Sequence, residues 1–219
     1  MYFGFSIEKK IDSIVILGRG LSFKAFFTDN TFSKSIQDVM LINYEEQDLN
    51  KKEISALYKK RIHILFNIEE PHLSKEQINK LKVSSIHIAR TKSMRFKKIG
   101  RRITKAGNIY GKVKYLPNEI DKYWYLNNCG LLGIAYATKV LKSKKIILYG
   151  FDFYQDDKFF NLPQNKDVKK LHQKLGENIK EVGKIQKMKF LEFVNDNPTV
   201  DYFISSKTDF QLTRNLHLI

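Results

Sequence analysis

Short apolar runs rich in β-branched residues recur along the chain and predict buried strands. The first run, SIVIL at 13–17, leads directly into Gly18 and Gly20. Runs of this length that end in turn residues are typical of strands covered on both faces of a parallel sheet. The pattern predicts six strands, at 13–17, 38–43, 61–66, 84–88, 145–149 and 200–204.

Segments with helical spacing of apolar residues lie between these strands. We expect helices at 51–59, 74–81, 131–141 and 176–194, and a helical start after Ser22. Strands that alternate with helices predict an α/β fold, with a Rossmann-like parallel sheet flanked by helices. A length of 219 residues fits a single domain over 1–219.

Two segments lack a clear period. From Lys92 to Asn118 the chain is basic and contains three glycines, so we expect irregular structure there. The polar, turn-rich segment 155–175 follows a predicted strand, and we interpret it as a lid over a site.

The formal net charge of +16 is concentrated in one block. Between Gln77 and Asn118 there is no acidic residue, whereas basic residues are frequent. This block is either a solvated lysine-rich surface or an attractor of polyanions such as nucleic acid, an anionic membrane or an anionic glycolipid. The sequence contains one cysteine, no apolar run of membrane-spanning length and no signal-peptide pattern at its start. We therefore expect a cytoplasmic protein, with peripheral contact at the inner face of a membrane left open.

Two turns carry the candidate chemistry. In the first, the strand at 13–17 runs into Gly18, Arg19, Gly20 and Ser22 before the chain becomes helical. Glycines at such a turn let backbone amides approach a phosphate, and the start of a helix favours negative charge. A purely structural turn between strand and helix fits this motif equally well, because the third glycine of the full dinucleotide-binding motif is absent.

The second turn region spans residues 126–155. Asn128, Cys129 and Gly130 stand at a predicted helix start, where side-chain amides and helix N–H groups gather. The strand at 145–149 then delivers Asp152 and Tyr154 at its carboxyl end, where open α/β sheets bind their ligands.

These motifs resemble glycosyltransferase family 42, the bacterial sialyltransferases, and the related motility-associated-factor transferases. The first turn is similar to the family's G-N-G-P-S-L turn, and Asn43 matches an Asn at the end of its second strand. The runs at 128–130 and 150–154 (GFDFY) match the family's T/S-S-G helix start and G-I-D-F-Y strand end, and 191–193 repeats its L-E-F.

The resemblance implies a variant of the GT-A fold and an inverting, metal-independent transfer of sialic acid or a similar acid sugar from a CMP donor. It implies a glycan or glycolipid acceptor, as in lipooligosaccharide biosynthesis, no cofactor, and a homo-oligomer. Consistent with the metal expectation, the sequence has no Asp-x-Asp triplet. The donor-binding residues carried over are Gly18, Arg19, Gly20, Ser22, Asn43, Asn128, Cys129, Gly130 and Asp152, with Tyr154 as a catalytic residue at the donor phosphate.

The sequence departs from the family at Arg19, Cys129 and Phe160, and at the catalytic base, since the position implied near Val182 is not His. His172 is the nearest upstream histidine, and we take it as the candidate base, against the alternative of an exposed residue at a helix start. The other four histidines are interpreted as structural or solvent-facing, at His63, His72, His87 and His217.

Two other functions remain open from the sequence alone. The basic block, with Tyr110, Tyr115 and the aromatic run at 123–125 for stacking, allows a nucleic-acid-binding protein. The missing histidine allows a catalytically silent relative that binds a nucleotide sugar without transferring it.

Overall fold

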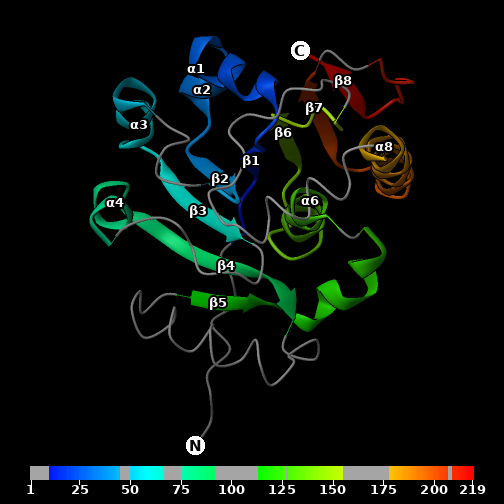
Figure 1. Cartoon of the computed structure of the whole chain (residues 1–219), viewed down its shortest axis with the longest axis horizontal. Helices are drawn as coiled ribbons and strands as arrows, with labels where there is room; N and C mark the ends of the chain where they lie inside the picture. The colour runs from blue at the N-terminus through cyan, green and yellow to red at the C-terminus, as the bar shows by residue number, and fades with distance from the viewer. Residues whose placement is uncertain are drawn as a thin grey trace, which may run out of the picture.

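A computed structural model describes residues 10–44, 50–66, 75–91, 113–126, 128–154, 178–206 and 209–219. Its strands form one eight-stranded sheet, with all neighbouring strands parallel and the order β5-β4-β3-β2-β1-β6-β7-β8 (Figure 1). The strands are β1 (Ser13–Leu17), β2 (Asp38–Ile42), β3 (Arg61–Phe66), β4 (Val83–Thr91), β5 (Val113–Leu116), β6 (Lys145–Tyr149), β7 (Asp201–Ser205) and β8 (Leu216–Leu218).

Helices cover both faces of this sheet (Figure 1). They are the 3₁₀ helices η1 (Leu21–Lys24) and η4 (Asn118–Leu126), and the α-helices α1 (Ala25–Thr28), α2 (Phe32–Ser35), α3 (Lys51–Leu57), α4 (Lys75–Lys80), α6 (Cys129–Lys139) and α8 (Ile179–Asn195). The α/β class and the parallel, Rossmann-like sheet predicted from the sequence are therefore confirmed.

Two apolar cores lie on opposite faces of the sheet. On one face α6, α8 and η4 pack against alternate strand residues, with Tyr136, Phe190 and Phe193 among the largest side chains that are almost fully buried. On the other face η1 and α1 contribute Phe23 and Phe26. Alternation along each strand distributes its side chains between the two cores, which explains why the strands are apolar along their whole length.

Among the described elements, strands β5 and β8 and helices α2 and η4 were not predicted. Both strands, β5 and β8, lie at the edges of the sheet, where only part of each strand is covered: Leu116 and Leu216 are buried, whereas Lys114 and Leu218 are exposed. Edge strands therefore lack the continuous apolar run that marks the central ones. The expectation of irregular structure up to Asn118 is wrong for β5, and η4 begins at Asn118 itself.

The connectivity reverses at β1. The chain proceeds outward through β2, β3, β4 and β5, then returns to place β6 on the other side of β1. Strands β1 and β6 pair in register from Ser13 with Lys145 to Leu17 with Tyr149, so the two strands end at the same level. In open α/β sheets ligands bind outside the carboxyl ends of the strands at such a switch point.

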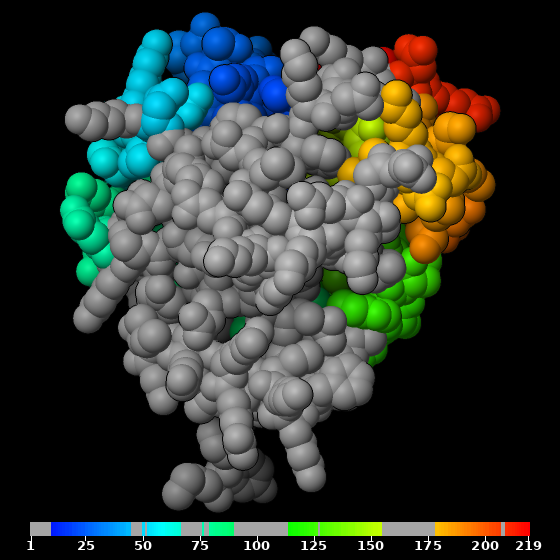
Figure 2. All heavy atoms as spheres, viewed as in Figure 1, coloured from blue at the N-terminus to red at the C-terminus, as the bar shows by residue number. Residues whose placement is uncertain are grey.

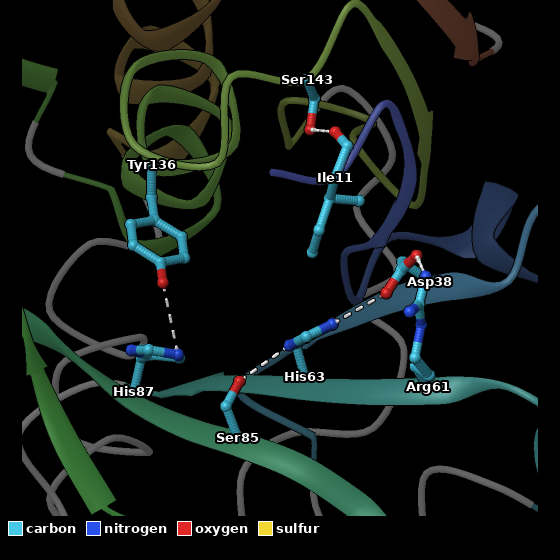
Figure 3. Close-up of polar contacts among 8 residues, drawn as sticks. All are labelled: Ile11, Asp38, Arg61, His63, Ser85, His87, Tyr136 and Ser143. Atoms are coloured by element: carbon cyan, nitrogen blue, oxygen red, sulfur yellow. Dashed lines mark hydrogen bonds and ion pairs between the residues drawn. The ribbon is translucent and has the colours of Figure 1, made fainter. Parts of the chain in front are cut away.

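A polar network crosses the sheet face beneath α6, away from the carboxyl ends (Figure 3). Asp38 on β2 binds Arg61 at 2.5 Å and His63 at 3.2 Å, and the other ring nitrogen of His63 lies 2.7 Å from Ser85 Oγ. Burial opposes ionisation of Asp38, but the bonds from His63 and Arg61 prevail and lower its pKa. These bonds join β2, β3 and β4 side by side, so a single group of polar side chains fixes the alignment of three strands.

His87 lies beside this network but is enclosed more completely. It is 3% exposed, its ring packs 4.9 Å from that of Tyr136, and its Nε2 lies 3.4 Å from the Tyr136 hydroxyl (Figure 3). Burial, followed by the charges of His63 and Lys114, lowers the pKa of His87 to about 3. His87 is therefore a neutral part of the core at physiological pH.

The burial of His87 predicts a loss of stability in acid. An unfolded histidine takes up a proton near pH 6.5, whereas folded His87 does so only at about pH 3, so protonation favours the unfolded chain between these values. The contribution is complete above about pH 6.5 and declines by about 1.4 kcal/mol per pH unit below it. His87→Gln should reduce this slope by about one proton, as measured by urea unfolding from pH 7 to pH 4.5.

The matched control is His217→Gln, because the His217 side chain is 43% exposed on edge strand β8. We expect it to retain the wild-type slope. Equal slopes for wild type and His87→Gln would contradict the burial of a neutral imidazole.

Candidate functional site

The turns that follow β1 and β6 are in direct backbone contact. Gly18 N–H donates to the Tyr149 carbonyl at 2.7 Å, and Gly20 N–H donates to the Gly150 carbonyl at 2.9 Å. A Cβ atom on Gly18 would overlap the carbonyl oxygen of Gly150. Glycine is therefore required at position 18 because the two turns meet through their main chains.

Side chains lock the same two turns together. Ser22 N–H donates to Asp152 Oδ2, and Gly150 N–H donates to Ser22 Oγ, both at 2.9 Å. A Cβ atom on Gly20 would overlap the Asp152 carboxylate. The N–H groups of Gly18, Gly20 and Ser22 are thus bonded within the protein, and they hold the first turn against the second.

A second group of predicted residues meets at the ends of β2 and β3. Asn43, directly after β2, donates its N–H to the Leu65 carbonyl at 2.8 Å, and the Cys129 thiol lies 4.0 Å from that same carbonyl oxygen. Burial raises the pKa of Cys129 to about 12, opposed by a hydrogen bond with the Asn43 side chain. Cys129 is therefore a neutral thiol at physiological pH and lacks the thiolate that a nucleophile needs.

A third group brings together α6, the second turn and α8. Asn128 caps α6, since its Oδ1 accepts from Leu131 N–H at 3.1 Å, and its Nδ2 donates to Gln186 Oε1 on α8 at 3.0 Å. Burial raises the pKa of Tyr154, while hydrogen bonds with Asn128 and Gln186 oppose that rise. The phenol and the two amides form a neutral polar cluster at the carboxyl edge of the sheet.

Gly130 connects these groups. A Cβ atom there would lie 2.7 Å from a ring carbon of Phe151 and 3.1 Å from Asn128 Oδ1. The absence of a side chain at position 130 lets the start of α6 approach the second turn. Of the donor-binding residues predicted from the sequence, those on the two turns and at the α6 start, with Asn43, therefore lie at one edge of the sheet.

Three of the five described non-glycine residues with positive φ lie at this edge, and the other two, Lys82 and Lys142, lie elsewhere. Asn43, Phe153 and Tyr154 have positive φ angles of 52°, 46° and 55°, a region that residues other than glycine rarely adopt. Strained residues persist only where the surroundings fix them, and they cluster at binding and catalytic sites. The second turn thus holds Tyr154 in an orientation that relaxed backbone would not give.

Sequence reasoning missed Gln186 and Gly183. Both lie in α8, which was predicted only as an amphipathic helix, and Gln186 reaches a partner 58 positions earlier in the chain. A glycine in the interior of a helix was the available signal, because glycine costs about 1 kcal/mol relative to alanine there. The candidate base His172 and the expected lid at 155–175 lie outside the described residues.

The aromatic run at 123–125 is divided between the core and the surface. Tyr123 and Trp124 pack against the core beneath α6, and the Tyr123 ring meets Phe193 edge to face. Tyr125 is 45% exposed, and its carbonyl accepts from Lys189 on α8, so α8 and η4 lie side by side on the flank of the molecule (Figure 2). Residues 92–112, which include Tyr110 and most of the Lys and Arg residues of the basic block, lie outside the described residues.

Within the described ranges, no three His, Cys, Asp or Glu side chains are placed to hold a metal ion together. No helix in that part of the chain is long and apolar enough to cross a membrane. No protein-family model matches the chain, and no curated protein matches it. What the site does must therefore be argued from its own side chains.

The contact between the turns predicts a steric penalty at position 18. Gly18→Ala forces a methyl group into the Gly150 carbonyl, which is backbone and cannot rotate away, so we expect a loss of about 1–3 kcal/mol or more in unfolding free energy. Gly133→Ala in α6 is the control, because its new Cβ meets only side-chain ends at 3.0–3.3 Å and alanine favours the helix. Denaturant unfolding of both variants measures the difference, and similar losses would contradict the proximity of the turns.

The raised pKa of Cys129 predicts low thiol reactivity. At pH 8 the folded protein should react with a disulfide reagent about two to three orders of magnitude more slowly than the same protein in denaturant, because so little thiolate is present. Cys129 is the only cysteine, so the absorbance of the released thiol reports on this residue alone. Equal rates in folded and unfolded protein would show that the thiol is not shielded.

Proposed function

We propose that this chain binds a CMP-linked acid sugar at the carboxyl edge of β1 and β6 and transfers the sugar to a glycan or glycolipid acceptor. The observation that carries the proposal is the convergence of two glycine turns and a neutral polar cluster at the switch point of a parallel sheet. Nucleotides bind at this point in folds of this class. The resemblance of the same residues to family 42 sialyltransferases supplies the donor.

Positive charge on the first turn and on the chain as a whole favours the binding of an anionic donor. Arg19 lies half-buried between Gly18 and Gly20, which places a guanidinium on the first turn, and the net charge of the chain is +16. Arginine binds phosphate through charge-assisted hydrogen bonds. In this proposal Arg19 and Tyr154 hold the phosphate, and their donors stabilise CMP as the bond to the sugar breaks.

In this proposal the other candidate residues either contact the nucleotide or support the turn that carries Arg19. We place the ribose and cytosine beside Asn43 and Cys129 at the ends of β2 and β3, next to Gly130 at the start of α6. Gly18, Gly20, Ser22 and Asp152 act by fixing the turn that carries Arg19, through the bonds they make to each other and to the second turn.

Proton removal from the acceptor needs a group that titrates near neutral pH. Asn128, Gln186 and the high-pKa groups Tyr154 and Cys129 do not serve this purpose. His172 is therefore kept as the proposed base. A protein that binds CMP but neither hydrolyses nor transfers from any CMP-linked acid sugar would instead be a silent relative.

Calorimetry with CMP tests the proposal directly. Wild-type protein should bind CMP more tightly than AMP or GMP, and Arg19→Ala should weaken CMP binding by on the order of 1–3 kcal/mol, because one charged donor to the phosphate is lost. Lys34→Ala is the matched control, since it removes an exposed positive charge on α2 and alters net charge equally.

Three outcomes would count against this function. Absence of CMP binding removes the donor assignment. Equal effects of Arg19→Ala and Lys34→Ala would assign the attraction to net charge rather than to the turn. Tighter binding of random RNA than of CMP, abolished by salt, would favour the nucleic-acid alternative.

A further inference from the structure

Gln186 is the one α8 side chain with a described hydrogen bond to the candidate site. It lies half-buried on α8, and its Oε1 accepts from Asn128 Nδ2 at 3.0 Å. It also hydrogen-bonds with the Tyr154 hydroxyl. Gln186 therefore contacts two candidate site residues that come from two other segments of the fold.

The approach of α8 depends on Gly183, one helical turn before Gln186. A Cβ atom on Gly183 would overlap the Phe153 carbonyl, so the bare helix backbone rests on the second turn at this point. Residues three apart lie on the same face of a helix. The contact at Gly183 consequently brings Gln186 against Tyr154, the residue after Phe153.

The orientation of the amides follows from the helix cap. Asn128 Oδ1 accepts from Leu131 N–H, so the nitrogen of this amide is the group directed at Gln186. Gln186 receives that bond on Oε1, which leaves its Nε2 as the donor. Both amides favour the ionised form of Tyr154, as N–H groups that donate to the phenol oxygen do.

A phenol oxygen that accepts from amide N–H groups is biased to use its own O–H as a donor. The natural acceptors for such a hydroxyl are phosphate and carboxylate oxygens. Without Gln186, the Tyr154 hydroxyl is able to turn and donate to the Asn128 side-chain oxygen instead.

We propose that Gln186 is a positioning residue that orients the Tyr154 hydroxyl as a hydrogen-bond donor toward the phosphate of a bound nucleotide. The phosphate part rests on the function proposed above, whereas the orientation of Tyr154 stands on the contacts among Asn128, Tyr154 and Gln186. Gln186 does not itself meet the ligand.

The first test uses ligand binding. Gln186→Met keeps the length of the side chain and removes both amide functions, and Ile185→Met, at the adjacent 45%-exposed residue, is the control. We expect Gln186→Met to weaken CMP binding by about tenfold or more and to leave cytidine binding unchanged, because cytidine lacks the phosphate. In a Tyr154→Phe background, Gln186→Met should have no further effect on CMP binding.

The second test needs no ligand. In protein labelled with ¹³C at tyrosine Cζ, Tyr154→Phe identifies the Tyr154 resonance, which reports on hydrogen bonds at the phenol oxygen. Gln186→Met should shift this resonance, whereas Ile185→Met should not. Thermal unfolding of each variant verifies that the fold is kept.

Each result decides a different part of the inference. Unchanged CMP affinity in Gln186→Met, or a further loss in the Tyr154→Phe background, overturns the positioning role. An unchanged Tyr154 resonance does the same. If wild-type protein binds no CMP, the proposed function and the phosphate assignment fail, and the resonance alone decides whether Gln186 orients Tyr154.

Discussion

The main-chain contact between the turns after β1 and β6 is the constraint on which the site depends. Because Gly18 and Gly150 leave no room for a side chain between them, the switch point of the sheet is closed by backbone, not by packed side chains. Ser22 and Asp152 then fix the turns in the second direction. This junction positions Arg19 on the first turn and both Phe153 and Tyr154 on the second turn.

Polar side chains gather at two different positions along the strands of the sheet. Near the carboxyl ends, the described cluster of Asn128, Tyr154 and Gln186 is polar but uncharged. At the amino ends of β2 and β3, Asp38 and Arg61 carry opposite charges and bind each other, which helps to align the two strands. The carboxyl edge also carries Arg19 on the first turn and Asp152 on the second turn, where Asp152 Oδ2 accepts from Ser22 N–H.

The central strands were predictable because burial on both faces leaves continuous apolar runs, and β1, β3 and β6 begin and end where the pattern indicates. The edge strands β5 and β8 were not predictable, because they are only partly buried and lack a continuous apolar run. Sequence also indicated which residues follow the strand ends. It could not show that Gly18, Gly20 and Ser22 give their amides to the protein itself, because those partners lie about 130 positions away. Sequence analysis missed Gln186 for the same reason, because its contacts depend on how α8 packs and not on its neighbours in the chain.

The position of β1 in the middle of the sheet affects how the chain folds during its synthesis on the ribosome. One edge of β1 pairs with β2, which follows about twenty residues later in the chain. The other edge of β1 pairs with β6, which ends only at Tyr149. At roughly 5–20 residues per second, that edge stays open for on the order of ten seconds of synthesis. Throughout this interval an apolar strand with unpaired backbone groups is available to other chains. The central position of β1 therefore leaves one edge of an apolar strand unpaired until β6 has been synthesised.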